Sequence, residues 1–390
     1  MIDNELFELI KDLVEIESVN KNEEHLGNFL YEFAKKNGLG YEKQYCTSSR
    51  FNVLISYPPV SSDSDFALLF HGHYDTVAKL DMEDPFHIKR ENNVIKGRGT
   101  VDQKSGIASA LYALLQLKKE NVSLSKPVVL ACVIDEESEH RGSMKLVESK
   151  IKSDFAIVTE PTNLSVVLGC KGTLPIKILV KGKTSHGCRP WLGVNAIQQA
   201  LPILDKLFKA EFDKVDFGPN CGILHDSINV GVVKAGTAYN NVADTCEISL
   251  DCRIIPGESP LAMINRIKEI FEECKRENPT LKVSYSIDRP DWDWQPIKER
   301  GLLSASIDER EQIVKSIVKI HEELNGTKPN MYITDGYTDM DFLINDLRIP
   351  TIVYGPGIPS LCHTAEEQIE LSEIEKAYIA YKKIILTLCR

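Results

Sequence analysis

The spacing of hydrophobic and polar positions predicts helices and strands that alternate along most of the chain. Apolar residues recur at helical intervals in residues 3–17, 23–37, 107–117, 313–324 and 371–388. Short apolar runs bounded by turn residues predict strands at 51–56, 67–70, 127–134, 155–158 and 351–354. Because runs such as 127–134 have no polar face, they are typical of a parallel sheet covered by helices. We therefore expect an α/β domain with a mostly parallel sheet and helices on both of its faces.

Residues 173–288 follow a different order of elements. The expected elements are a strand at 174–180, a helix at 194–208, strands at 227–234 and 245–253, a helix at 260–276 and a strand at 281–287. This β-α-β-β-α-β order is that of a ferredoxin-like α+β layer. We predict an inserted domain at 173–288, within a discontinuous first domain made of 1–172 and 289–390. The Pro- and Trp-rich segment 289–300 is interpreted as the connector back to that first domain, with its tryptophans packed.

The composition is that of a soluble globular protein, with 390 residues, 43% of them hydrophobic and 26% charged. A net charge of −11 argues against nucleic-acid and anionic-membrane partners, because either surface requires a basic patch. A small molecule is therefore the expected partner. The ten cysteines contain no C-x-x-C pair, the N-terminus is acidic, and no apolar stretch approaches membrane-spanning length. These features predict reduced thiols and a cytoplasmic location.

Candidate chemistry begins where the strand at 67–70 ends. His71, His73 and Asp75 follow at every second position, which puts their side chains on one face of an extended segment. Imidazole suits zinc or cobalt, and a metal-bound histidine usually needs a carboxylate to fix its tautomer, which Asp75 is placed to supply. Taken alone, the pattern is equally typical of a half-buried strand with polar residues on its solvent-exposed face.

The segment 96–106, KGRGTVDQKSG, leads into a helical pattern. It does not match the dinucleotide-binding motif G-x-G-x-x-G, because its third glycine position is Asp102. It does not match a phosphate-binding loop either, since Lys104 and Ser105 lack the glycine that precedes the lysine there. A carboxylate at this tight turn is placed either to cap the helix or to face the carboxyl edge of the sheet.

Acids and a histidine also follow the other predicted strands. Asp135, Glu136 and Glu137 close the strand at 127–134, and three adjacent acids repel one another unless a cation is near. Glu160 follows the strand at 155–158, and His363 follows the strand at 351–354. Because strand ends in an open α/β sheet share one edge, we expect these side chains to meet at a ligand site. The alternative for the three adjacent acids is a solvated loop.

The inserted domain contains no cluster of acids with histidines, so we predict no metal site there. It does carry isolated polar residues that a small α/β layer does not require, namely His186, Asn241 and Arg253. From the residues alone, a surface or satisfied-core role is the simpler interpretation of each. Two roles are open for Asp339 and Asp341. They either favour a cationic substrate, such as an ornithine derivative, or cap a helix.

Taken together, these motifs resemble the metal-dependent amidohydrolases that include acetylornithine deacetylase, succinyl-diaminopimelate desuccinylase, aminoacylase and glutamate carboxypeptidase. The motifs span nearly the whole chain and are HGHYDTV (71–77), GRGTVDQKSG (97–106), DEE (135–137), EPT (160–162), SHGCRPWLGVNAI (185–197), GTAYNNV (236–242), DCRIIPGE (251–258) and YGPG with His363 (354–363). Several motifs in this order are more specific than any one of them. The chain departs from the family pattern at Ser105 and at 138–142, which bears on substrate preference rather than on metal binding.

The resemblance implies a centre of two divalent metal ions, with zinc expected first and cobalt as the alternative. His73 and Glu160 would hold one ion, while Glu137 and His363 would hold the other. Asp102 would bridge the two ions. Two imidazoles and three carboxylates neutralise most of the charge of such a pair and leave room for a bridging water.

The resemblance also implies the catalytic roles. Glu136 would be the general base that takes a proton from the activated water and passes it to the departing amine. Asp75 would orient His73 through its other ring nitrogen. His186 would stabilise the oxyanion in the active site of the neighbouring subunit of a homodimer, so that the inserted domain serves as lid and dimerisation surface.

The substrate contacts implied by the resemblance are Asn241, Arg253 and Gly355, and the planar fork of Arg253 suits a carboxylate. We predict a hydrolase of the amide bond in N-acyl amino acids or related small acylated amines. A dipeptidase or carboxypeptidase with the same metal centre is the nearest alternative, because both reactions pass through one tetrahedral intermediate. A metal-binding scaffold without catalysis is the alternative of another class.

Overall fold

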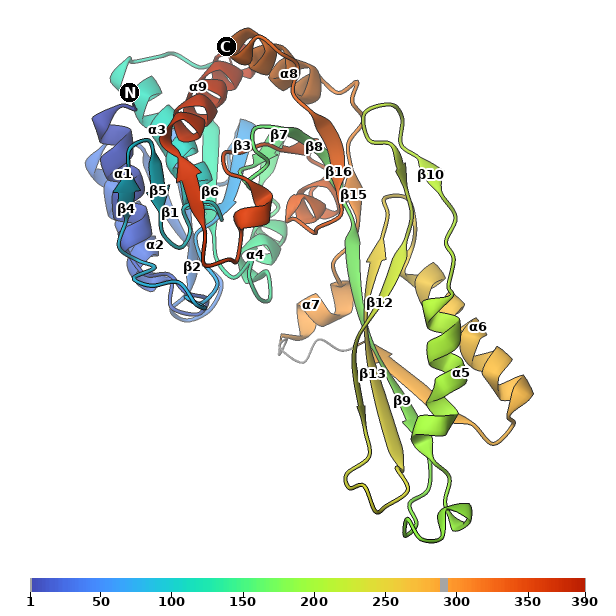
Figure 1. The fold of residues 1–390 in the computed structure, drawn as a ribbon. Coiled ribbons are helices and arrows are strands. Elements are labelled where there is room, and N and C mark those ends of the chain that lie inside the picture. The colour runs from blue at the N-terminus through green and yellow to red at the C-terminus, as the bar shows by residue number, and fades with distance from the viewer. Residues whose placement is uncertain (1, 288–293, 390) are drawn as a thin grey trace. The chain divides into compact units, whose positions relative to one another are not determined.

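The computed structural model describes residues 2–287 and 294–389, which form two compact units (Figure 1). The first unit comprises Met1–Gly169, Ser306–Thr334 and Thr338–Arg390, and the second comprises Cys170–Ala305 and Asp335–Tyr337. The second unit therefore begins close to the start of the predicted insert at residue 173. The predicted boundary between residues 288 and 289 lies outside the described residues, as does Trp292 of the expected connector.

The first unit is built on a sheet whose middle strands are parallel. In order across the sheet, these strands are β6 (Val128–Val133), β3 (Asp65–His73), β7 (Lys152–Val158) and β17 (Thr351–Val353). Antiparallel strands flank them, with β2 (Phe51–Tyr57) and β1 (Gly40–Tyr45) beyond β6, and β8 (Val166–Cys170) beyond β17. β2, β6 and most of β3 are buried along their length, as is typical of strands covered by helices on both faces. The prediction of a mostly parallel α/β sheet is confirmed.

Neighbouring residues of β3 show that helices cover both faces of this sheet. Phe70 packs against Tyr381 of α9 with ring centroids 5.0 Å apart, whereas the next residue, His71, bonds to Ser143 of α4 at 2.8 Å. Successive side chains of a strand point to opposite faces, so α9 and α4 lie on opposite sides of β3. The helices of this unit are α1 (Asn4–Glu15), α2 (Glu24–Lys36), α3 (Lys104–Lys119), α4 (Arg141–Ser149), α8 (Gln312–Asn325) and α9 (Leu371–Leu388).

A small antiparallel sheet in the first unit joins two segments that lie far apart in the sequence. Its strands, in spatial order, are β18 (Gln368–Glu370), β5 (Val94–Lys96) and β4 (Lys89–Glu91). Pairing of Gln368 with Lys96 brings the loop at 97–103 beside the segment at 362–367. Two loops that the sequence predicts to carry metal ligands are thereby placed side by side.

The second unit contains an antiparallel sheet with the strand order β12-β13-β9-β14. Its elements are β9 (Gly172–Lys181), α5 (Ala196–Phe208), β12 (Ser227–Ala235), β13 (Thr245–Ile254), α6 (Pro260–Glu277) and β14 (Lys282–Ile287). Alternate residues of β13 are buried, because one face of the sheet packs against α5 and α6. The predicted ferredoxin-like layer is confirmed, with each element within a few residues of its predicted bounds.

The remaining elements are short. They are β10 (Val215–Asp216), β11 (Ile223–Leu224), α7 (Gln295–Arg300), β15 (Ala305–Ser306), β16 (Met331–Thr334), the 3₁₀ turns Pro190–Leu192 and Pro359–Leu361, and the π-helical turn Phe342–Asp346. Among the described residues, every helix is too short or too polar to cross a membrane.

Candidate metal centre

Adjacent parallel strands deliver the candidate residues to one edge of the main sheet. β3 ends at His73, Glu136 and Glu137 follow β6, and Glu160 follows β7. β6 and β7 are the two neighbours of β3 and run parallel to it. Their carboxyl ends therefore lie together, which is where ligands bind in open α/β sheets.

The carboxylate of Asp102 lies between two histidines, one at each of its oxygens. Oδ1 is 3.0 Å from Nε2 of His73, and Oδ2 is 3.1 Å from Nε2 of His363. On the first side, Oε1 of Glu160 lies 3.4 Å from the same His73 nitrogen. On the second side, Oε1 of Glu137 lies 2.8 Å from Nε2 of His363. The side chains thus form two triads that share Asp102.

The donor set of these triads fits a pair of divalent metal ions. Within each triad, the atoms that can bind a metal lie within 4.8 Å of one another. Each triad combines one imidazole nitrogen with carboxylate oxygens, which are donors that zinc takes in proteins. The alternative role of Asp102 as a helix cap is not realised, because α3 begins after Gln103 and has no side-chain cap. Asp102 can therefore serve both metal positions at once.

Protons provide the counter-charge in this cluster when no metal is bound. Hydrogen bonds to Asp102 and Glu137 raise the pKa of His363 to about 10. Burial alone would lower the pKa of His73, but the charge of Glu160 and a hydrogen bond to Asp102 raise it well above its ordinary value. Burial, followed by the charge of Asp102, raises the pKa of Glu160 to about 7. Both imidazoles are consequently protonated at neutral pH in the absence of metal.

Glu136 stands beside this centre without belonging to either triad. One of its oxygens lies within 4.8 Å of the ligand-capable atoms of His73 and Glu137. Burial raises the pKa of the Glu136 carboxyl well above its ordinary value. A carboxylate in this position can exchange a proton with a molecule bound between the triads.

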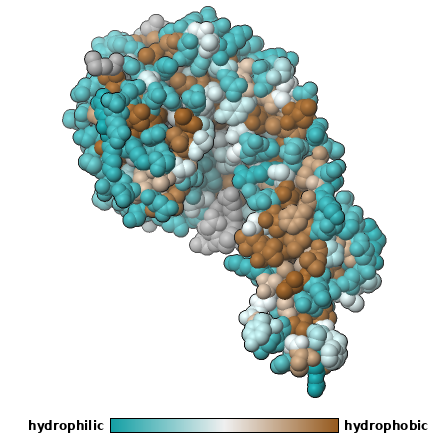
Figure 2. All heavy atoms as spheres, in the orientation of Figure 1, coloured by the Kyte–Doolittle hydropathy of each residue, from teal (hydrophilic) through white to brown (hydrophobic). Residues whose placement is uncertain are grey.

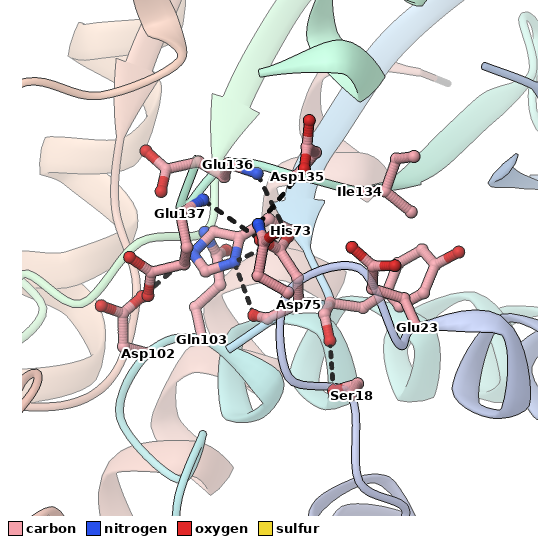
Figure 3. A network of polar contacts seen from close by, with 12 residues as sticks. Ser18, Glu23, His73, Asp75, Asp102, Gln103, Ile134, Asp135, Glu136 and Glu137 are labelled. Atoms are coloured by element: carbon pink, nitrogen blue, oxygen red, sulfur yellow. Dashed lines mark hydrogen bonds and ion pairs between the residues drawn. The ribbon is translucent and has the colours of Figure 1, made fainter. Parts of the chain in front are cut away.

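Asp75 fixes the acid pair rather than only the histidine beside it (Figure 3). Its Oδ1 accepts the backbone N–H of Glu136 at 3.2 Å, and its Oδ2 accepts that of Glu137 at 3.1 Å. His73 Nδ1 lies 3.0 Å from the backbone carbonyl of Asp75 and 3.6 Å from its carboxylate. Asp75 therefore orients His73 chiefly through its main chain, while its carboxylate holds the turn that carries both acids.

The third adjacent acid, Asp135, points away from Glu136 and Glu137 in Figure 3, and its partners are two arginines. Its Oδ1 accepts a hydrogen bond from Arg50 at 2.6 Å, and its Oδ2 lies 3.4 Å from Arg141. Arg50 also pairs with the buried Glu23 at 2.5 Å. The repulsion expected among three successive acids is thus relieved by separate cations. Arg50 was not predicted as a site residue, because a single arginine before a strand gives no local signal of a partner 85 residues away.

Glu367 organises the loop that carries Asp102. One oxygen of its buried carboxylate accepts the backbone N–H groups of Gly99, Val101 and Asp102 at 2.8, 3.0 and 3.2 Å. The other oxygen pairs with the buried guanidinium of Arg98. The sequence analysis missed this residue, since Glu366-Glu367 reads as an ordinary acidic pair.

Gln103 connects the Asp102 loop to Glu160. Its side-chain N–H donates to Oε1 of Glu160 at 2.5 Å, and its side-chain oxygen accepts from the hydroxyl of Thr159 at 2.6 Å. Because both ends of the amide are bonded, the Glu160 carboxylate has a fixed orientation toward His73.

The predicted residues of the insert all belong to the second unit. His186 and Asn241 are both exposed and form an isolated β-bridge, so their loops lie side by side. Arg253, near the end of β13, is partly exposed and donates from Nε to Asp251 at 3.1 Å. The structure therefore brings His186 and Asn241 together and gives Arg253 a carboxylate partner of its own. Their roles toward a substrate stay predictions.

Gly355 and Asp339 have buried surroundings. The N–H of Gly355 donates to the hydroxyl of Thr162 at 3.1 Å, and a Cβ on Gly355 would lie 2.5 Å from the carbonyl oxygen of Glu160. Close packing against the Glu160 segment accounts for the glycine, and its contact with a substrate stays a prediction. Asp339 is buried and bonds to His140 at 2.8 Å.

Comparison with known proteins places this geometry in a family. Residues 69–387 match the model of peptidase family M20/M25/M40. The chain belongs to this family. It is accordingly a metallopeptidase, a hydrolase that acts on amide bonds, and the resemblance stated from the motifs is confirmed.

Relatives of the chain differ in the activity that their names state. The chain is 28% identical over 412 residues to a probable carboxypeptidase of Trichophyton verrucosum, with 98% of this chain and 84% of that protein covered. It is 29% identical over 368 residues to an acetylornithine deacetylase of Buchnera aphidicola, with 92% of this chain and 89% of the relative covered.

Solved structures show the same fold. A tripeptidase from Staphylococcus aureus superposes with a TM-score of 0.81 at 21% identity, and the match covers 100% of this chain and 99% of that one. A Bacillus subtilis protein described as a dinuclear metal binding peptidase of the M20 family gives a TM-score of 0.72 at 14% identity, with 98% and 97% of the two chains covered.

Replacement of Glu367 by Ala is expected to lower the free energy of unfolding by about 3–5 kcal/mol, because Arg98 then stays buried without a counter-charge. Chemical denaturation of the metal-free protein measures this loss. The matched control is Glu366→Ala, since Glu366 is exposed and pairs with Lys96 at the surface. Equal stability of the two variants would show that the buried pair with Arg98 is not important for folding.

Binding of zinc to the metal-free protein is expected to release protons, because the imidazoles of His73 and His363 must lose theirs to become ligands. The apparent affinity should therefore weaken as the pH falls. Titration calorimetry in buffers of different ionisation enthalpy measures the number of protons released. His363→Gln should release fewer, and a heat independent of the buffer would contradict the assigned charge state.

Proposed function

We propose that this M20 protein hydrolyses the amide bond of N-acyl amino acids or related small acylated amines at a centre of two zinc ions. The observation that supports this most is the position of Asp102, whose two oxygens face two separate histidine–carboxylate pairs. His73 and Glu160 would hold the first ion, Glu137 and His363 would hold the second, and Asp102 would offer one oxygen to each. Cobalt is the second choice of metal, because it accepts the same nitrogen and oxygen donors.

The side chains of the centre have distinct tasks in this reaction. Two ions held by these side chains would supply Lewis-acid polarisation of the scissile carbonyl and of the attacking water. Glu136 takes the proton of that water and delivers it to the departing amine, since it is the acid beside the triads that is not needed as a ligand. Asp75 keeps Glu136 in place through its backbone N–H.

Residues of the second unit recognise the substrate and its oxyanion. His186 donates a hydrogen bond to the developing oxyanion, and Asn241 lies on the adjacent loop. Asp251 accepts from Nε of Arg253, which directs the terminal donors of the guanidinium to a substrate carboxylate. Gly355 allows close approach beside Glu160.

Homodimerisation through the second unit completes the proposed site. β12 is an edge strand of its sheet, and its Val232 and Val233 are about half exposed. α5 contacts β12 and exposes Leu201 and Phe208. Figure 2 shows a band of hydrophobic residues over this unit. Pairing of two such edges buries apolar area and extends the sheet. His186 acts in the neighbouring subunit.

A dipeptidase or carboxypeptidase activity is the second candidate. The names of the tripeptidase and carboxypeptidase relatives favour it, and the same centre serves either amide. A panel of N-acetyl amino acids, N-succinyl-diaminopimelate and dipeptides, assayed with added zinc or cobalt, distinguishes the two. Turnover confined to dipeptides would replace the deacylase proposal, and no turnover of any amide would favour the metal-binding scaffold.

A cytoplasmic location is part of the proposal. It is supported by the buried positions of several cysteines, which are typical of reduced structural thiols. Cys132, Cys246 and Cys252 are buried thiols, as predicted.

Glu136→Gln is expected to keep both metal ions and to lower turnover by roughly 10²–10⁴-fold, which is the usual contribution of general acid–base catalysis. Metal content and kcat are measured on the same preparation. Glu139→Gln is the matched control, because Glu139 is a buried acid of the same loop that pairs with Arg141 instead. Unchanged turnover of Glu136→Gln would remove Glu136 from the role of general base.

Arg253→Ala is expected to lower kcat/KM by roughly 10- to 100-fold for substrates with a free carboxylate, since a hydrogen bond to a charged group is lost. The corresponding carboxamides should be affected little. Equal losses on the acid and the amide of one substrate would argue against this contact.

A mixture of His186→Ala and Glu136→Gln subunits is expected to recover about one quarter of the wild-type activity, because each mixed dimer of a symmetric pair contains one intact site. Each variant alone should be nearly inactive. Sedimentation measures the dimer, and exchange of subunits before the assay produces the mixed species. Failure to recover activity in verified mixed dimers would place His186 in its own subunit's site or outside catalysis.

A further inference from the structure

A partly buried asparagine of the N-terminal segment joins two carboxylates next to the acid pair. The side-chain amide of Asn20 donates to Oδ2 of Asp75 at 3.3 Å and to Oδ1 of Asp135 at 3.2 Å. Both carboxylates are fully buried. Because an ionised carboxylate can only accept hydrogen bonds, the N–H end of the amide is the end that faces them. One side chain thus connects residues that lie 55 and 115 positions away along the chain.

The two carboxylates that Asn20 joins also shape the turn of the acid pair. Oδ2 of Asp75 accepts the backbone N–H of Glu137 in addition to Asn20, and its Oδ1 accepts the backbone N–H of Glu136 (Figure 3). Asp135 directly precedes Glu136, and its φ of 70° lies in the left-handed region that residues other than glycine rarely adopt. Such a conformation persists only where surrounding contacts enforce it.

Backbone pairing fixes the segment that carries Asn20. The N–H of Asn20 donates to the carbonyl of Thr76 at 3.0 Å, and the N–H of Thr76 donates to the carbonyl of Ser18 at 2.9 Å. The hydroxyl of Ser18 donates to the carbonyl of Tyr74 at 2.6 Å. The residues on either side of Asp75 thus hold the segment that places the Asn20 amide against the Asp75 carboxylate.

We propose that Asn20 is a positioning residue, which fixes through Asp75 and Asp135 the turn that presents Glu136 to the substrate. The proposal rests on the proposed function, because that function makes Glu136 the general base. Two neighbouring buried carboxylates repel each other, and the two N–H donors of one amide satisfy an oxygen of each without adding a charge. A base on a turn held in this way keeps the orientation that proton transfer requires.

A brace that attaches the N-terminal segment to the first unit is the alternative role of Asn20, and Ser18 separates the two roles. Ser18→Ala removes the bond from the same segment to Tyr74 and leaves Asp75 and Asp135 with their donors. Asn20→Ala removes the donors to both carboxylates and keeps the backbone bond to Thr76. Bracing predicts losses of stability and activity in both variants, whereas positioning predicts a loss of kcat in Asn20→Ala alone.

The expected result for Asn20→Ala is a loss of roughly 10- to 100-fold in kcat with KM changed little, while Ser18→Ala stays within about two-fold of the wild type. Saturating zinc and a measured metal content are required, because the same turn carries Glu137. Asn20→Ser keeps a single, shorter donor and is expected to lie between Asn20→Ala and the wild type, and it replaces Asn20→Ala if that variant does not fold.

A double variant tests whether Asn20 acts through the base. In a Glu136→Gln background, Asn20→Ala should add almost no further loss of kcat, because the residue that it positions is already disabled. Multiplicative losses, or equal losses in Asn20→Ala and Ser18→Ala, would overturn the proposal and leave the hydrolase assignment standing.

A spectroscopic measurement tests the positioning without any substrate. In zinc-loaded protein labelled with ¹⁵N-glutamate, the backbone amide resonances of Glu136 and Glu137 report on their hydrogen bonds to Asp75. Both resonances should shift in Asn20→Ala and stay in place in Ser18→Ala. Unchanged resonances in Asn20→Ala would overturn the proposal. If the wild-type protein hydrolyses none of the amides in the panel, the proposed function fails, and these resonances still decide whether Asn20 fixes the turn.

Discussion

The first unit of this protein is organised around the repulsion of carboxylates that are gathered at one edge of the main sheet. Asp102, Glu137 and Glu160 share a small volume with His73 and His363, and the three carboxylates are largely buried, so solvent screens their charges poorly. Such a cluster is stable only with positive charge among the acids, supplied by protons on the imidazoles or by divalent cations. The demand for cations is thus a consequence of the fold, since parallel strands bring these residues to one edge.

Holding the acids in place against this repulsion requires other parts of the chain. Backbone N–H groups of the two loops donate hydrogen bonds to buried carboxylates and so fix the loops that carry the acids. Such groups carry partial positive charge without adding a titratable group. Asp75 accepts two of them and so shapes the turn of the acid pair, and Glu367 accepts three and so shapes the Asp102 loop. Each organising carboxylate is itself buried, which makes both loops rigid before any metal binds.

In the proposed function, metal binding and substrate recognition are divided between the two units. Every residue of the two triads belongs to the first unit, whereas His186, Asn241 and Arg253 belong to the second. Under the proposed function, this division separates the residues that bind metal from those that select a substrate, and relatives whose names state different activities share the fold.

Local periodicity was sufficient to predict the long helices, the buried parallel strands and the order of elements along the second unit, because burial imposes a repeat that is visible in the sequence itself. The short polar strands β4, β5 and β18 escaped prediction, since their exposed residues follow no such repeat. The sequence also determined, through its motifs, which side chains are chemically suited to metal. Only the tertiary structure decided that Asp102 offers one oxygen to each histidine, that Glu367 holds its loop, and that Asp339 meets His140 from 199 residues away. Contacts of this kind depend on how distant segments pack, and no local pattern records them.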